Sequence, residues 1–142
     1  MTALPPLPER ALSIRQPWAW AILNAGKDIE NRPRRYHYRG PICIHASLAM
    51  TDKDYDPFSD LVKEHFPDNC SRWITQFCNG GDARGGIIGT AEILDCIETS
   101  DSPWFFGPYG LVLRNVQPVP FIPVKGALGL FRWRKNLERR AG

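Results

Sequence analysis

The stretch "PWAWAILNAGKDIENR", residues 17–32, joins an apolar run to a cluster of charges. Pro17 suits the first position of a helix, because its missing N–H would have no partner there, and Gly26 suits the position just past the last turn. The segment that follows is predicted to be short and extended, and it ends at Pro33. Four charged residues therefore follow directly on an aromatic-rich helix: Lys27, Asp28, Glu30 and Arg32. They form either a solvated turn or the floor of a site.

The spacing of these charges leaves their roles open. Successive side chains of an extended segment point to opposite faces, so Asp28, Glu30 and Arg32 would share one face. Lys27 would point the other way unless it still belongs to the turn. A lysine beside a helix end can simply complement the exposed carbonyls. In a site, Lys27 would bind a phosphate or a carbonyl, with Glu30 holding it or acting as a base.

The rest of the chain predicts an α+β fold. Helices are expected at 55–66 and 69–78, a glycine-rich loop at 79–86 and an aromatic loop at 102–110. Apolar alternation and β-branched runs predict short strands at 10–14, 40–47, 87–98, 111–116, 119–124 and 126–133. A bulge is expected at Gly89, and prolines 118, 120 and 123 argue for edge positions or breaks. Strands and helices do not alternate regularly, which favours a small, partly closed barrel with helices at its side.

The length of the chain limits the number of domains, and its charge indicates what kind of partner it could bind. A chain of 142 residues is about one domain long, here 10–142, preceded by a Pro-rich flexible arm at 1–9. The net charge is only +3, but residues 32–39 and 132–140 together hold nine of the 18 Lys and Arg. Concentrated positive charge suits a polyanionic partner, and a solvated arginine-rich face is the plain alternative.

Two arginine-bearing motifs are candidates for binding anions and bases. In "NRPRRYHYR" (31–39), arginines alternate with aromatic residues, a pattern typical of single-stranded or looped RNA recognition. The phosphate-binding candidates there are Arg34, Arg35 and Arg39. In "IRQPWAW" (14–20), Arg15 and Gln16 precede a helix whose first N–H groups are free, which suggests an anion site. Trp18 is either a core residue or a platform for a base.

Three further features come from strands and loops. Glu92 lies among apolar strand residues and needs a partner if it is buried, either Lys27 or an arginine. The aromatic loop "SPWFFGPYG" (102–110), with Trp104 and Tyr109, forms either a plug in the barrel or a wall that stacks a flat ligand. His45 and Ser47 would face the same way on one strand. Neither has the local neighbours of a nucleophile motif, so a catalytic Ser–His pair is not expected.

The sequence gives no reason to expect a metal, a cofactor or a membrane. The four cysteines do not form a C-x-x-C pair, and the three histidines do not complete a zinc spacing. Cys43 and Cys96 lie in apolar runs and are expected to be buried thiols. The first residues lack the pattern of a signal peptide, and no apolar run is long enough to span a bilayer. We therefore expect a cytoplasmic protein.

Four segments of the chain, taken together, resemble the ASCH-domain family. They are "LSIRQPWAWAILNAGKDIENR" (12–32), "RGPICIHAS" (39–47), "GGIIGTAEILDC" (85–96) and "PWFFGPYGLVL" (103–113). The resemblance runs from Leu12 to Trp133, and its most specific part is the G-K-x-x-E-x-R signature after an S-I-x-x-P-W helix start. It implies a PUA-like fold, a small curved β-barrel with flanking helices and a cleft at one end. Members of the family are associated with RNA binding and RNA-linked regulation.

The resemblance also implies which residues form the site. Gly26, Lys27, Glu30 and Arg32 would line the cleft, and the 102–110 loop would close it. Some small bacterial relatives remove the acetyl group of N4-acetylcytidine with a Lys, a Thr three positions later and a strand Glu. Here Lys27 matches the Lys and Glu92 matches the Glu, but Glu30 stands in place of the Thr.

Several functions follow as hypotheses. The first is binding of RNA or of a modified nucleotide or nucleoside in the cleft. The second is amide hydrolysis on a modified nucleoside, with Lys27, Glu30 and Glu92 as catalytic residues. The third is a metal-independent ribonuclease with a Lys, Tyr and Arg set, and a protein-binding adaptor is the remaining alternative.

Overall fold

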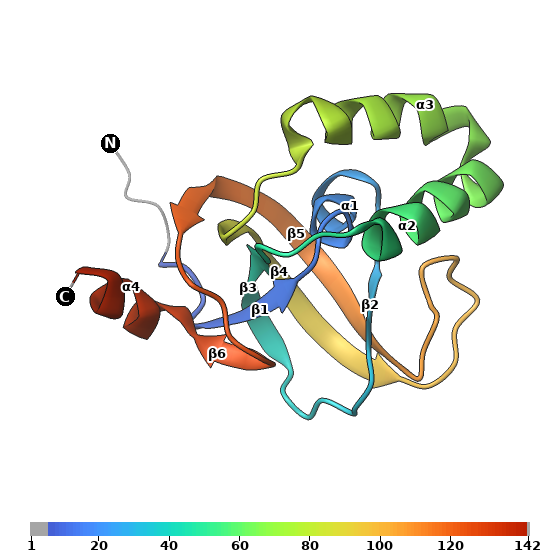
Figure 1. The fold of residues 1–142 in the computed structure, drawn as a ribbon. Helices are drawn as coiled ribbons and strands as arrows, with labels where there is room; N and C mark the ends of the chain where they lie inside the picture. The colour runs from blue at the N-terminus through green and yellow to red at the C-terminus, as the bar shows by residue number, and fades with distance from the viewer. Residues whose placement is uncertain (1–5, 142) are drawn as a thin grey trace.

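The protein is described here by a computed structural model that covers residues 6–141, with side chains to Leu137 (Figure 1). One six-stranded sheet is flanked by four α-helices. The strands are β1 (Arg10–Ile14), β2 (Ile29–Arg32), β3 (Gly40–Ala46), β4 (Gly86–Ile97), β5 (Tyr109–Pro123) and β6 (Leu130–Arg132). The helices are α1 (Trp18–Asn24), α2 (Asp52–His65), α3 (Pro67–Gln76) and α4 (Trp133–Ala141), with a π-helical turn, η1, at Phe77–Gly81. The predicted α+β class is confirmed.

The sheet curls into a half-barrel with strand order β2-β5-β4-β3-β1-β6. Only β1 and β3 run parallel; the other neighbouring strands are antiparallel. The two long central strands, β4 and β5, slip in register at three places, the first between Ile87 and Gly89. Bulges of this kind bend a strand and increase its twist, which is what curls the sheet. A bulge was expected at Gly89, and the irregularity lies directly before it: Gly89 is paired in both ladders, and Ile88 is the residue that the register skips.

The two faces of β3 are buried against different parts of the molecule. Ile42 and Ile44 pack with Ile22 of α1 in the main core. Cys43, on the opposite face, packs with Ile87 and Trp133 in a second cluster. This double burial explains why the strand reads as an almost continuous apolar run. Cys43 and Cys96 are both buried free thiols, as predicted.

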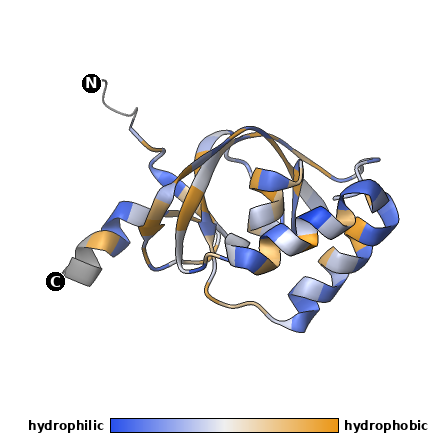
Figure 2. Cartoon of the chain, turned by 90° about the horizontal axis from the view of Figure 1, so that it is seen from above, coloured by the Kyte–Doolittle hydropathy of each residue, from blue (hydrophilic) through white to orange (hydrophobic). Residues whose placement is uncertain are grey.

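The helices α2 and α3 lie on one side of the sheet, and α4 lies on the opposite side (Figure 1). Figure 2 shows hydrophilic and hydrophobic residues mixed along these helices. The buried Phe58 of α2 packs against Trp20 of α1 and Phe77 of η1. α2 begins at Asp52, three residues before the predicted start, because Thr51 and Asp54 form a capping box. The helix predicted at 69–78 is α3, which ends at Gln76. The π-helical turn η1 follows it and extends into the predicted loop 79–86.

Two sequence predictions at the C-terminal end are wrong. The expected strands 111–116 and 119–124 are one strand, β5, and its prolines do not interrupt it. β2 pairs with β5 only as far as Val112, so beyond that point β5 has an open edge where a missing N–H costs little. The expected strand 126–133 is reduced to β6, and Trp133 begins the unpredicted α4. Its indole N–H donates to the Pro8 carbonyl at 2.8 Å. Residues 1–5 of the expected flexible arm lie outside the described residues, and the arm's flexibility stays a prediction.

The close approach at the Gly89 bulge gives a test of the fold. A Cβ at Gly89 would lie 2.6 Å from Cδ2 of Leu23 and 2.7 Å from the Gln117 carbonyl oxygen. Overpacking at a backbone contact typically costs about 1–3 kcal/mol, so Gly89→Ala should lower the free energy of unfolding by that amount in urea titrations. Leu94→Ala, at a partly exposed position on the same strand, is the control. An equal loss in the two variants would contradict this account of the bulge.

Candidate functional site

A cleft of about 1040 Å³ opens at the end of the half-barrel where β1 and β2 meet the loop after β5. One wall comes from residues in 121–129, and residues in 45–49 and 84–85 lie next to it: the Val124 N–H donates to the Gly85 carbonyl at 3.1 Å, and the Gly85 N–H donates to the Ala46 carbonyl at 2.7 Å. Ser13, Trp18, Glu30 and Arg32 also line the cleft. Its charged lining residues are Arg15, Glu30, Arg32, Arg84 and Lys125. Positive charge therefore dominates the lining.

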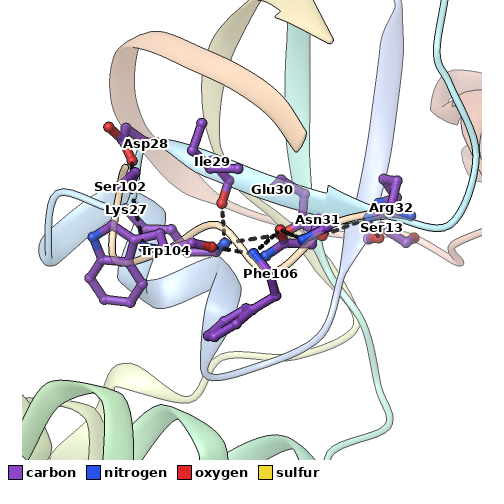
Figure 3. Close-up of polar contacts among 11 residues, drawn as sticks. Ser13, Lys27, Asp28, Ile29, Glu30, Asn31, Arg32, Ser102, Trp104 and Phe106 are labelled. Carbon is purple, nitrogen blue, oxygen red and sulfur yellow. Dashed lines mark hydrogen bonds and ion pairs between the residues drawn. The ribbon is translucent and has the colours of Figure 1, made fainter. Parts of the chain in front are cut away.

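The Glu30 carboxylate is held between two cations at the floor of this cleft (Figure 3). Its Oε1 lies 3.5 Å from the Lys27 ammonium, and its Oε2 accepts a hydrogen bond from Nη2 of Arg32 at 3.0 Å. Gly26 has φ +69°, and the Lys27 N–H still bonds to the Ala21 carbonyl at 3.2 Å. Lys27 thus belongs to the turn, which is why its side chain turns toward Glu30.

Asp28 does not share the face of Glu30 and Arg32, contrary to the prediction from strand alternation. β2 begins only at Ile29, so alternation does not extend back to Asp28. The exposed Asp28 carboxylate instead accepts a hydrogen bond from the Ser102 hydroxyl at 2.7 Å. It ties the aromatic loop to the turn (Figure 3).

Lys27 is buried behind the cleft and is committed to contacts within the protein. It is 2% exposed, donates to the Ile29 carbonyl, and lies 5.4 and 5.9 Å from the ring centroids of Trp18 and Trp104. Burial lowers the pKa of Lys27, and the neighbouring Glu30 carboxylate opposes that shift. Within the described part of the chain, Lys27 does not reach the cleft surface, whereas Glu30 and Arg32 do.

The Arg32 side chain lies at the cleft and is only partly satisfied by contacts within the protein. Its Nη2 donates to Glu30 and also to the Ser13 carbonyl at 2.9 Å. Its Nε is buried and has no partner among the described residues. The Arg32 side chain as a whole is 17% exposed and lines the cleft, so the part of the guanidinium that faces the cleft is open to a ligand acceptor, whereas the buried Nε is not.

A hydrogen-bonded chain of Ser13, His45 and Val124 also lines the cleft. The Ser13 Oγ lies 2.9 Å from Nδ1 of His45, and Nε2 of His45 lies 2.7 Å from the Val124 carbonyl oxygen. Burial lowers the pKa of His45. Sequence reasoning placed His45 beside Ser47 on one strand and missed Ser13. Ser13 faces His45 only because β1 and β3 pair in parallel with these two residues opposite each other.

The Ser13–His45–Val124 hydrogen-bond chain differs from a nucleophilic Ser–His pair. The histidine of such a pair becomes an imidazolium during the reaction and is stabilised by a carboxylate. Here a neutral backbone carbonyl stands in that position, and the ring is 2% exposed. The arrangement favours hydrogen bonding to a ligand over covalent catalysis.

At the start of α1, the structure separates Arg15, Gln16 and Trp18. Arg15 lines the cleft and pairs with Asp54 at 3.1 Å, and Trp18 forms part of the wall. Gln16 is fully buried: it accepts from the Trp20 N–H and donates to the Ala83 carbonyl, both at 2.8 Å. The prediction that Gln16 binds a ligand is therefore corrected, because both polar groups of its side chain are satisfied inside the protein.

The aromatic loop forms a plug more than a wall. Trp104 is 2% exposed and stacks on Phe66 at 5.4 Å, and Tyr109 lies under the Arg35 guanidinium at 5.1 Å. Neither lines the cleft, so their prediction as ligand-stacking residues is corrected. Phe106 is the exposed aromatic residue of this loop, and it contacts Trp18 edge-to-face at 6.2 Å.

The predicted phosphate-binding arginines lie outside the cleft. Arg35 pairs with Glu98 at 3.2 Å and Arg39 with Asp95 at 3.6 Å, while Arg34 is exposed. Exposed pairs of this kind contribute little to stability. Arg84 and Lys125 line the cleft instead. Neither could be predicted from sequence, because both lie in loops without a recognisable motif.

Glu92 is paired with an arginine, which was one of its two predicted partners. Its carboxylate lies 2.9 Å from Nη2 of Arg114, and the side chain is 31% exposed. The charges that act on Lys27 are those of Glu30, Asp28 and Arg32. The amidohydrolase hypothesis requires Glu92 to lie beside Lys27, and the structure does not bring these two residues together.

The described residues contain neither a cluster suited to a metal ion nor a membrane-spanning helix. Across residues 6–137, whose side chains the structure describes, there is no group of three or more His, Cys, Asp or Glu residues arranged to hold a metal ion. Nor is any helix of that range long and apolar enough to cross a bilayer.

The sequence also matches a family model, that of the ASCH domain, over residues 12–117. The chain belongs to the ASCH-domain family. A search of curated proteins finds no match. The ASCH match includes the G-K-x-x-E-x-R turn and the Ser13–His45 pair, and the curled sheet agrees with the predicted PUA-like barrel. It ends before residues 121–129, so one wall of this ASCH cleft comes from a segment outside the match.

The position of Glu30 gives a stability test. Glu30→Gln leaves the buried Lys27 ammonium without a counter-charge, and breaking a buried pair in this way typically costs about 3–5 kcal/mol. Urea unfolding at pH 7 should show that loss. Glu92→Gln removes a carboxylate from a half-exposed pair and should cost less than about 1 kcal/mol. If the two variants lose equal stability, Glu30 does not have the structural importance assigned to it.

Proposed function

We propose that this ASCH protein binds single-stranded RNA, or a nucleotide derived from it, in the cleft. The observation that carries the proposal is the excess of cationic side chains in the cleft, where Arg15, Arg32, Arg84 and Lys125 stand against a single carboxylate, Glu30. Guanidinium groups bind phosphate oxygens through two parallel hydrogen bonds, and Arg32 has donors left for such contacts.

The charge balance of the cleft supports an anionic ligand. The Glu30 carboxylate is already neutralised by Lys27 and Arg32, and Arg15 shares its charge with Asp54. Arg84 and Lys125 are exposed on neighbouring segments of the lining, since the Val124 N–H donates to the Gly85 carbonyl at 3.1 Å. The free positive charge available to a ligand therefore comes mainly from Arg32, Arg84 and Lys125.

The apolar residues of the cleft support stacking of bases. Trp18 forms one wall, and Phe121, which is 47% exposed, forms another. Leu48 and Leu128 are 74% and 98% exposed at the same cleft. Exposed apolar side chains around a cationic floor match a ligand with flat bases on a charged backbone. A cleft of about 1040 Å³ is at the upper end of the usual range for small-molecule pockets and has room for more than one nucleotide.

Binding is favoured over hydrolysis by the position of Lys27. A nucleophile or general base must reach the substrate, whereas Lys27 is buried and held by Ile29 and Glu30. Its proposed catalytic partner, Glu92, is paired with Arg114.

Salt dependence tests the phosphate contacts. If three cations each neutralise one phosphate of a single strand, the logarithmic salt slope is about −2, and affinity falls roughly 20-fold between 50 and 200 mM salt. The double variant Arg84→Gln/Lys125→Gln should keep only one contact, with a slope of about −0.7 and a loss of about threefold over the same range. Fluorescence anisotropy of a labelled RNA pentamer gives both values.

Arg72→Gln is the matched control, because Arg72 is exposed on α3. It should leave the slope unchanged. Equal slopes for the wild type and the double variant would place the RNA elsewhere on the surface, and absence of binding at 50 mM salt would refute the proposed function.

The hydrolase alternatives are tested by incubation without metal. N4-acetylcytidine and a mixed-sequence RNA, each incubated with the purified protein and followed by chromatography, should both remain intact. Acetate release that disappears in Lys27→Ala would establish the amidohydrolase instead. RNA fragments that disappear in that variant would establish a ribonuclease.

A further inference from the structure

The hydrogen-bond chain from Val124 to Ser13 fixes what Ser13 offers to a ligand. The Val124 carbonyl can only accept, so Nε2 of His45 must carry a proton. His45 is buried without a nearby counter-charge in its hydrogen bonds, which favours the neutral ring. Nδ1 then carries no proton and accepts, so the Ser13 hydroxyl must donate its hydrogen to Nδ1.

Ser13 therefore presents only lone pairs to the cleft. Its side chain is partly exposed there, and its one hydrogen is used by His45. The glycine at 126 packs tightly over this pair: a Cβ there would lie 2.5 Å from Oγ of Ser13 and 2.7 Å from Cε1 of His45. The pair is thus held in one arrangement, and Oγ acts as an acceptor.

This acceptor lies beside a donor. The guanidinium of Arg32 donates to the backbone carbonyl of Ser13 itself, and its side chain lines the cleft and is 17% exposed (Figure 3). A ligand that fills both positions must carry a hydrogen-bond donor close to an anionic group. The ribose of RNA has this combination, because its 2′-hydroxyl is adjacent to the 3′-phosphate. Deoxyribose lacks the hydroxyl.

We propose that Ser13, oriented by His45, is the residue by which this cleft distinguishes ribose from deoxyribose. Its Oγ accepts the hydrogen of a 2′-hydroxyl while Arg32 holds the neighbouring phosphate. The inference rests on the proposed function, since it assigns the sugar specificity of the same site.

The test compares three labelled pentanucleotides of one base sequence with ribose, 2′-deoxyribose or 2′-fluoro-ribose. The 2′-fluoro sugar keeps an RNA-like pucker but has no hydrogen to donate, so it separates the hydrogen bond from sugar shape. Anisotropy titrations at 50 mM salt should show the wild type binding the ribose oligomer about fivefold more tightly than either analogue, the size of one neutral hydrogen bond.

Ser13→Ala should bind all three oligomers alike, with the affinity that the wild type has for the analogues. Ser47→Ala is the matched control, because Ser47 lines the same cleft but lies outside the hydrogen-bond chain. It should keep the preference. Gly126→Ala, which crowds the Ser13–His45 pair, should reduce the preference without removing a ligand contact.

Each outcome decides the question. A preference that persists in Ser13→Ala would overturn the inference, and so would equal binding of the ribose and 2′-fluoro oligomers by the wild type; in both cases RNA binding itself would stand. If the wild type binds none of the three at 50 mM salt, the proposed function fails and the inference fails with it. The wild-type comparison needs no variant, so it holds even if Ser13→Ala folds poorly.

Discussion

The cleft depends on one buried carboxylate, that of Glu30, which lies between the Lys27 ammonium and the Arg32 guanidinium. Three charges taken out of water are tolerated only when they compensate one another and their remaining donors find partners. Lys27 meets this condition through the Ile29 carbonyl and two tryptophan rings. Arg32 meets it only in part, because its Nε stays unpaired. Its side chain is nevertheless 17% exposed at the cleft, so the guanidinium that compensates Glu30 is also available to a ligand.

The turn at Gly26 and the pairing of β2 with β5 place Lys27, Glu30 and Arg32 at the end of the barrel. The positive φ of Gly26 keeps Lys27 in the turn, and β2 pairs with the first residues of β5 from Ile29 onward. Asp28 then fastens the aromatic loop through Ser102, and Trp104 covers Lys27 from the far side. The aromatic loop thus keeps water from the buried lysine, a different role from stacking on a ligand.

The cleft combines a floor inside the ASCH match with a wall outside it. The floor supplies Arg32, Glu30 and the Ser13–His45 pair. The wall, residues 121–129, supplies Phe121 and Lys125, and its Val124 carbonyl fixes the histidine tautomer. The chemistry of the floor is therefore set in part by a segment that the family model does not cover.

The sequence by itself determined the α+β class, the helix–turn–strand order around Gly26 and the importance of Lys27, Glu30 and Arg32. These features depend on local rules: proline and glycine at helix ends, apolar periodicity and a short charged motif. Only the tertiary structure decided that Ser13 meets His45, that Arg84 and Lys125 face the cleft, and that Gln16, Trp104 and Tyr109 do not. It also separated Glu92 from Lys27. These contacts join residues far apart in the chain, and they follow from strand pairing and sheet curvature, which local sequence patterns do not encode.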